Sequence, residues 1–171
     1  MKIQPVTAEH RPKVHALLVR AFPGSTYEAT LVEDLRRNGR PLLEWACLHV
    51  NRVIAYAAFS HAYQGKDCCG LHLAPMAVAP DFQRQGIGSE LMRFALRQPA
   101  IKERTLFVVG HPAFHRKFGF EPCAQPTSAF DRKGGHFLAM RNTATTPFVV
   151  GYEPEFSRSA KAPAAGGKKR R

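Results

Sequence analysis

The sequence predicts one mixed α/β domain with helices on both faces of a single sheet. Its 171 residues match the usual size of one domain and are enough to bury a sizeable core. Segments with helical periodicity alternate with strand-like apolar runs in the order βααβββαβαββ. No repeat and no internal boundary interrupts this order before residue 157. We therefore predict a domain over residues 1–156.

The first half of the chain is predicted to form a strand at residues 2–6, two helices and a β-hairpin. Apolar residues at i, i+3, i+4 and i+7 define the first helix: Val14, Leu17, Leu18 and Ala21. The second helix follows a capping serine or threonine at 25–26 and stops at Asn38-Gly39. Two strand-like runs, 43–50 and 53–61, are separated by a short turn, which is typical of a hairpin.

The second half is predicted to form short strands and a short helix after the central helix. The continuous apolar run 105–109 is typical of a buried strand. Gly110-His111-Pro112 then opens a short helix over 113–118. The last strand candidates are Phe120, residues 137–140 and residues 148–150.

A glycine-containing turn, Gln83-Arg84-Gln85-Gly86-Ile87-Gly88, links the strand ending at Val78 to an amphipathic helix. Glycine lets the backbone approach a ligand closely, and the free N–H groups of a helix start attract an anion. Arg84 adds a positive charge. The spacing fits neither the dinucleotide fingerprint nor the P-loop. We expect an anion here; the alternative is an ordinary strand–helix turn.

This turn resembles the acetyl-CoA signature of the GNAT superfamily of N-acetyltransferases, Q/R-x-x-G-x-G/A. Residues 107–120 are similar to the fourth-helix motif of that family, and in particular to its YhbS-like group. Residues 28–36 and 151–156 also resemble that group, so the likeness covers residues 1–156. It implies a mostly antiparallel sheet, acetyl-CoA as the donor, and direct acetyl transfer to a primary amine.

The resemblance also implies which residues bind acetyl-CoA. The backbone of the strand end would pair with the pantetheine arm, and the backbone of the turn would wrap the pyrophosphate. The implied residues are Met76, Ala77, Val78, Arg84, Gln85, Gly86, Ile87, Gly88 and Ser89. For Met76 and Val78 the alternative is ordinary packing in the sheet, which is compatible with backbone contacts to a ligand.

His115 is the expected general acid. Many family members have a tyrosine four residues before the glycine of the fourth-helix motif, and this chain has His115 there. Histidine can donate a proton near neutral pH. The alternatives are an ordinary surface histidine, with the proton supplied by water, Tyr27 or Tyr152. We expect His111 to be a turn residue and His72 to be a buried, hydrogen-bonded one.

The net charge of +12 is concentrated toward the C-terminus, where residues 157–171 carry six basic residues and no acidic one. This segment is rich in alanine and glycine, so we predict a disordered tail that binds nucleic acid at most weakly. The four cysteines show no disulfide-scaffold or metal-ligand spacing, and no apolar stretch is long enough to span a membrane. We expect a cytoplasmic protein without a metal.

We expect acceptor-determining residues in the first two helices and the loop around 22–25. The acceptor itself stays open at this level, since a small-molecule amine, an amino acid, an antibiotic, a peptide N-terminus and a lysine all fit the sequence. A monomer and a homodimer fit equally well. The missing tyrosine motivates one alternative function, a catalytically weak sensor or regulatory module that binds acyl-CoA.

Overall fold

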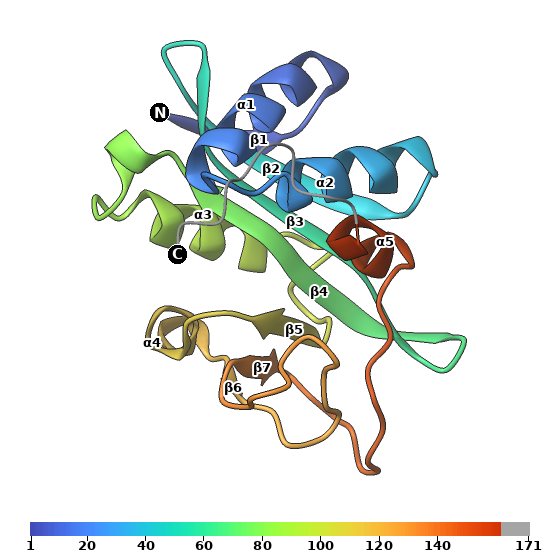
Figure 1. Ribbon diagram of the computed structural model, residues 1–171. Coiled ribbons are helices and arrows are strands. Elements are labelled where there is room, and N and C mark those ends of the chain that lie inside the picture. Colours follow the sequence, from blue (N-terminus) through green and yellow to red (C-terminus); the bar gives the residue numbers. More distant parts are fainter. Residues whose placement is uncertain (162–171) are drawn as a thin grey trace, which may run out of the picture.

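The fold is built on a seven-stranded sheet with two long strands at its centre. The computed structural model describes residues 1–161, and its strands lie in the order β1-β2-β3-β4-β5-β7-β6 (Figure 1). The bounds are Lys2–Pro5 (β1), Leu42–His49 (β2), Arg52–Gln64 (β3), Asp67–Val78 (β4), Leu106–Val109 (β5), Glu121–Pro122 (β6) and Phe137–Met140 (β7). Within the described residues, β4 and β5 pair in parallel and the other strand pairs are antiparallel. The predicted mixed, mostly antiparallel sheet is confirmed.

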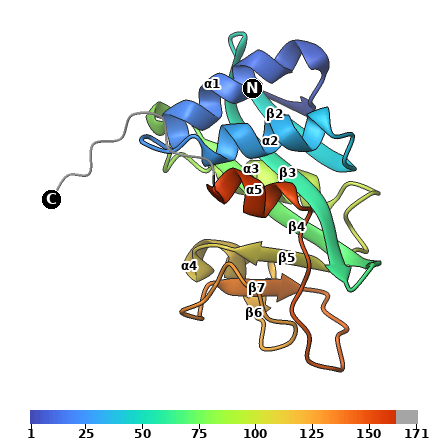
Figure 2. The ribbon, with the colours of Figure 1, turned by 45° about the vertical axis from the view of Figure 1, so that its right-hand side comes forward.

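Helices cover both faces of this sheet, as predicted. Figures 1 and 2 show α1, α2 and α5 over one face and α3 across the other. The bounds are Arg11–Ala21 (α1), Tyr27–Arg37 (α2), Ile87–Leu96 (α3), Pro112–His115 (α4) and Glu155–Lys161 (α5). The apolar stripe of α3 packs into the core through Ile87, Leu91, Met92 and Ala95. None of the helices that the structure describes is long and apolar enough to cross a lipid bilayer.

The predicted last strand at residues 148–150 does not form. Val149 makes an isolated bridge to Thr127, and Gly151 makes another to Tyr63. Because these two partners belong to different segments, no ladder can extend along the predicted strand. The segment instead runs past the end of the β3–β4 hairpin and leads into α5.

Two buried glutamates pair with Arg40, which follows α2, and anchor this C-terminal segment. The Nε of Arg40 lies 3.0 Å from Glu153 Oε2 and 2.9 Å from Glu155 Oε1. Both glutamates are almost completely buried, with exposed fractions of 2% and 1%. Burial alone would raise the pKa of Glu155, but hydrogen bonds from Asn38 and Arg40 hold it below its ordinary value. The segment is therefore held by charges that lose their compensation if Arg40 is removed.

Helix α5 crosses the domain boundary that the sequence predicts after residue 156. It continues to Lys161, and Ser159 is buried with its Oγ 3.4 Å from Asp34 Oδ2. The first residues of the predicted tail are thus helical in the structure. The remainder of that tail, 162–171, lies outside the described residues.

We predict that Arg40→Ala clearly lowers the free energy of unfolding, because it leaves two buried carboxylates with fewer partners. The matched control is Arg37→Ala, which removes an exposed pair to Asp34 at 2.7 Å and is expected to cost less than about 1 kcal/mol. Urea denaturation at pH 7 measures both. Equal effects of the two substitutions would show that the ion pairs of Arg40 do not anchor the segment.

Candidate active site

Strands β4 and β5 pair over only two residues and then separate. The pairs are Leu71 with Leu106 and His72 with Phe107. Beyond them β5 pairs with β7 on its far side, and no described strand pairs with the facing edge of β4. An open wedge therefore begins after residue 72, with the backbone polar groups of β4 along one wall.

A bulge in β4 accompanies this separation. Met76 pairs with Ala57 and Leu73 pairs with Phe59, so the two residues Ala74-Pro75 lie opposite one residue of β3. A bulge bends the strand and increases its local twist. Proline also has no N–H to contribute to a ladder. Both effects favour divergence of β4 from β5 at this point.

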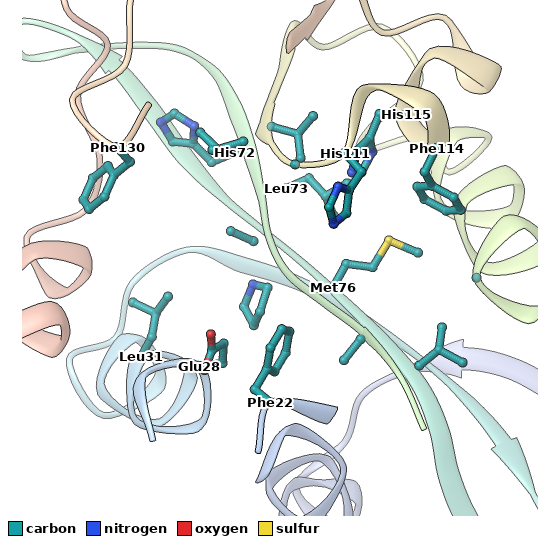
Figure 3. Close-up of a pocket in the computed structure, with 18 of the residues that line it drawn as sticks. Phe22, Glu28, Leu31, His72, Leu73, Met76, His111, Phe114, His115 and Phe130 are labelled. Carbon is teal, nitrogen blue, oxygen red and sulfur yellow. The ribbon is translucent and has the colours of Figure 1, made fainter. Parts of the chain in front are cut away.

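The wedge opens into a cavity of about 880 Å³. Its walls come from the α1–α2 connection, α2, β4, the turn at 83–88, β5, α4 and the C-terminal segment. Figure 3 shows side chains from these elements converging on one space, with Glu28 and Leu31 at one end and Met76 and Phe114 at the other. Segments far apart in the sequence thus share one cavity.

Five of the nine predicted donor-binding residues line this cavity: Met76, Ala77, Val78, Arg84 and Gly88. The other four do not line it, and they shape the turn or pack beneath it: Gln85, Gly86, Ile87 and Ser89. Gln85, for example, donates from Nε2 to the carbonyl of Asp81 at 3.1 Å, and Ile87 is buried in the core. The structure therefore brings the strand end and the turn to one wall.

The turn holds an uncommon backbone conformation that leaves the start of α3 open. Arg84 has a φ of 61° and Gly86 a φ of 81°, both in the left-handed region, and a non-glycine residue there points to a functional constraint. Gly86 is the N-cap and offers no side chain to the first turn of α3. The free N–H groups of that turn are therefore available to an anion.

Gly88 marks how closely a ligand could approach. A Cβ at this position would lie 3.3 Å from Val78 Cγ2, 3.6 Å from Met76 Cε and 3.7 Å from Phe114 Cζ. A side chain here would thus occupy the corner between β4, α3 and α4. Glycine keeps that corner free for a chain-like ligand lying along β4.

His115 lines the cavity in a buried, mainly aromatic environment. It is 7% exposed, and its ring meets Phe114 and Phe120 edge to face at centroid distances of 5.0 and 5.6 Å. Nδ1 has no hydrogen-bond partner among the described residues. Burial, and to a lesser extent His111, lowers the pKa of His115 to about 4. The ring is therefore neutral at pH 7, whereas the sequence led us to expect a protonated donor there.

His72 forms part of the opposite wall and is buried and hydrogen-bonded, as expected from the sequence. Its Nε2 donates to the carbonyl of Gly151 at 3.0 Å. Its ring stacks on that of Tyr152, with a centroid distance of 3.7 Å and an interplanar angle of 5°. Burial lowers the pKa of His72 to about 4. His111 is exposed at the N-cap of α4, which is the turn position expected for it.

Both tyrosines considered as alternative acids line the cavity and are uncharged at neutral pH. Burial raises the pKa of Tyr27 and of Tyr152 to about 12. The hydroxyl of Tyr27 donates to the carbonyl of Phe156 at 3.0 Å, and that of Tyr152 lies 2.7 Å from Ser128 Oγ. Each hydroxyl thus already has a partner within the protein.

Glu28 is the cavity residue that sequence reasoning missed. Among the described residues it is the one carboxylate in the lining, and its Oε2 accepts a hydrogen bond from Ser25 Oγ at 2.8 Å. The spacing Ser25-x-x-Glu28 matches a helix capping box, so the sequence suggests a purely structural role. No group of three or more histidine, cysteine or acidic side chains within residues 1–161 is placed to hold a metal ion.

Comparison with known proteins shows that this chain is similar to members of one protein family. A family model described as an acetyltransferase (GNAT) domain matches residues 43–122. The N-acetyltransferase YhbS of Escherichia coli is 36% identical over 118 residues, which cover 66% of this chain and 69% of YhbS. YjhQ of E. coli is 35% identical over 111 residues, covering 61% of each protein. The chain thus spans less than two thirds of the length of YjhQ.

Solved structures give a longer match. The crystal structure of E. coli YhbS in complex with CoA superimposes with a TM-score of 0.82 at 28% identity, covering 92% of both chains. A GNAT acetyltransferase from Brucella melitensis, in complex with acetyl-CoA, has a TM-score of 0.75 at 22% identity. It covers 91% of this chain and 97% of its own, and at this identity it supports the fold alone.

We predict that the protein loses stability as the pH falls from about 6.5 toward 4. The pKa values of His72 and His115 are lowered from 6.5 to about 4, so in this window the unfolded chain binds more protons than the folded one. Each histidine should lower the free energy of unfolding by roughly 2 kcal/mol at pH 5 relative to pH 7.5.

Urea unfolding of the wild type and of His72→Phe at both pH values measures this effect. Phenylalanine keeps the ring against Tyr152 and removes the titrating nitrogens. The variant should show about half of the wild-type pH dependence. An unchanged pH dependence would exclude His72 as a source of the acid instability.

Proposed function

The chain belongs to the GNAT family of N-acetyltransferases, and from this premise we propose that it transfers the acetyl group of acetyl-CoA directly to a primary amine. The observation that carries this proposal is one continuous cavity. It joins the open edge of β4 and the turn at 83–88 to a separate end that contains Glu28. Donor and acceptor can thus meet within a single space, as direct transfer requires.

The donor side of the cavity suits the extended, anionic shape of acetyl-CoA. The backbone of Met76, Ala77 and Val78 would pair with the amides of the pantetheine arm along the open edge of β4. The turn and the free N–H groups at the start of α3 would hold the pyrophosphate, with Arg84 adding positive charge. The empty corner at Gly88 supports this fit, since a Cβ would fill it.

The thioester supplies the acetyl group: the amine nitrogen bonds to the acetyl carbon, the carbon–sulfur bond breaks, and the proton lost by nitrogen ends on the thiol. The protein would contribute position and polarity. A backbone N–H on the open edge of β4 would donate to the thioester oxygen, where it stabilises the charge that develops during reaction. The apolar walls would exclude water and strengthen this interaction.

His115 would move the proton. Because burial keeps its ring neutral, it can accept a proton from the attacking nitrogen and release it to the departing sulfur. A pKa of about 4 makes the protonated ring a ready donor. The negative charge that grows on sulfur would favour the protonated form at that moment. In this role His115 takes the place of the tyrosine that many relatives have.

The setting that we propose is a cytoplasmic enzyme that acts as a monomer or homodimer. All four cysteines are free in the structure, with Cys68 exposed, which suits a reducing compartment. Nucleic-acid binding would be limited to weak contacts from the basic residues of 157–171, four of which lie beyond residue 161 and outside the described part of the chain.

An acyl-CoA sensor is the alternative function, favoured by the missing tyrosine at position 115. The two functions differ in a thiol-release assay with acetyl-CoA and a panel of amines. The enzyme releases CoA in proportion to the acceptor. A sensor binds acetyl-CoA and shows no acceptor-dependent release.

We predict that Gly88→Glu abolishes detectable acetyl-CoA binding while the protein stays folded. The added side chain would fill the corner against Val78, Met76 and Phe114, and its charge would repel the phosphates. Isothermal titration calorimetry measures the affinity, and circular dichroism measures the fold. Arg97→Gln is the matched control, because it changes the net charge by the same amount at the exposed far end of α3. Unchanged affinity in Gly88→Glu would remove the turn from donor binding.

We further predict that His115→Phe lowers kcat by about 10²-fold or more with little change in acetyl-CoA affinity. Phenylalanine preserves a buried ring against Phe114 and Phe120 and removes both nitrogens. His136→Phe, at an exposed position beside Asp131, is the control for loss of a histidine. Steady-state kinetics from pH 6 to 9 give the second readout: the wild-type kcat should show no alkaline fall from loss of an imidazolium. A kcat within about threefold of wild type would exclude His115 from proton transfer.

A further inference from the structure

Aromatic side chains dominate the end of the cavity that lies away from the turn at 83–88. They come from the α1–α2 connection, α2, the loop before β7 and the C-terminal segment: Phe22, Tyr27, Phe130, Tyr152 and Phe156. Figure 3 shows Phe130, Leu31 and Glu28 at this end and Met76 and Phe114 at the other. We refer to this region as the aromatic end.

Contacts among these side chains hold the aromatic end in shape without a ligand. Tyr152 meets Phe130 edge to face at 4.6 Å and Phe156 at 5.1 Å, and its other contacts fix it on His72 and Ser128. Phe130 is nevertheless 39% exposed. A large apolar ring left open at the rim of a preformed cavity is typical of a binding surface for an apolar group.

The distribution of charge in the cavity lining favours a cation over an anion at the aromatic end. Glu28 supplies the one carboxylate in the cavity lining within residues 1–161, and a single hydrogen bond from Ser25 leaves further lone pairs on its oxygens. The one arginine or lysine in this lining is Arg84, which lies on the turn at the donor side. An ammonium group thus finds a counter-ion at the aromatic end, and a carboxylate finds none.

We propose that the acceptor is an apolar monoamine, a primary amine carried on an aryl-alkyl or branched-alkyl body with no other charge. This inference rests on the proposed function and names its substrate class. Glu28 binds the ammonium as it enters, and the aromatic faces add cation–π attraction. The ammonium then loses one proton to solvent, and the neutral amine moves along the cavity to attack the thioester. The apolar body covers Phe130, Leu31 and Phe156. In this role Glu28 is a specificity-determining residue for the acceptor.

The same features disfavour the other acceptor classes. An α-amino acid brings a carboxylate close to Glu28 with no cation to compensate it. A polyamine or an aminoglycoside brings further ammonium groups that must lose water against aromatic rings without a second carboxylate. A protein lysine meets the requirement for one charge, but the chain around it would have to pass the rim at Phe130.

The experiment is an acceptor competition with the full-length protein and acetyl-CoA. Phenethylamine, L-phenylalanine and spermidine are the probes, and CoA release gives kcat/KM for each. We expect phenethylamine to exceed L-phenylalanine by about 100-fold and spermidine by at least about 10-fold. L-phenylalanine or spermidine used as well as phenethylamine would overturn the inference and leave the proposed function standing. Acetyl-CoA binding without release by any amine would overturn both.

A substitution then tests Glu28 itself. Glu28→Gln keeps the size and the bond from Ser25, and it should raise KM for phenethylamine at least about tenfold with acetyl-CoA affinity unchanged. Glu33→Gln is the matched control on the exposed face of α2, where Glu33 pairs with His15 outside the cavity. Inhibition by 2-phenylethanol, the uncharged analogue, should be the same in wild type and in Glu28→Gln. A KM for phenethylamine that stays at the wild-type value in Glu28→Gln would contradict the assignment.

Discussion

The divergence of β4 from β5 is the constraint on which the rest of this molecule depends. A parallel pair that continued past His72 and Phe107 would seal the wedge and satisfy the open edge of β4. The bulge at Ala74-Pro75 turns β4 away instead. The strand end then leads into a turn whose left-handed residues expose the start of α3. The open edge and the helix N-terminus therefore follow from one local departure from regular sheet geometry, and the donor side of the cavity needs both.

Burial divides the electrostatics of the cavity into two unlike regions. At the turn, Arg84 and free backbone N–H groups give a positive potential. Along the rest of the lining, burial among aromatic side chains removes charge from the groups that could carry it. His72 and His115 lose their protons because burial disfavours the charged ring, and the tyrosines keep theirs for the same reason. Glu28, which stays part-exposed, is left as the one negative group in the described lining. A single cavity can thus receive an anion at one end and a cation at the other.

Local signals in the sequence were sufficient for helices α1 to α4, for most of the strands and for the position of the turn. Helix α5 was not predicted, and the mostly antiparallel pairing was implied by the family resemblance. The turn and the strand end before it are contiguous in the chain, so their shared location on one wall follows from local structure. Properties created by distant packing were not accessible. Phe120 and the depth of burial set the protonation state of His115, and neither follows from spacing within a short helix. Glu28 could not be singled out, because only the folded structure brings it into the same cavity as β4 and the turn. Residues 148–150 have strand-like composition, but the segments they meet prevent a ladder.

The C-terminal segment that Arg40 anchors forms the part of the cavity wall that is synthesised last. Tyr152 and Phe156 complete the acceptor side, yet they follow β4, the turn and α3 in the chain. During translation, β4, the turn and α3 therefore leave the ribosome before the last residues of the acceptor side have been synthesised. The acceptor side is thus completed by the last elements of the described chain, and the ion pairs of Arg40 fix them to the rest of the domain.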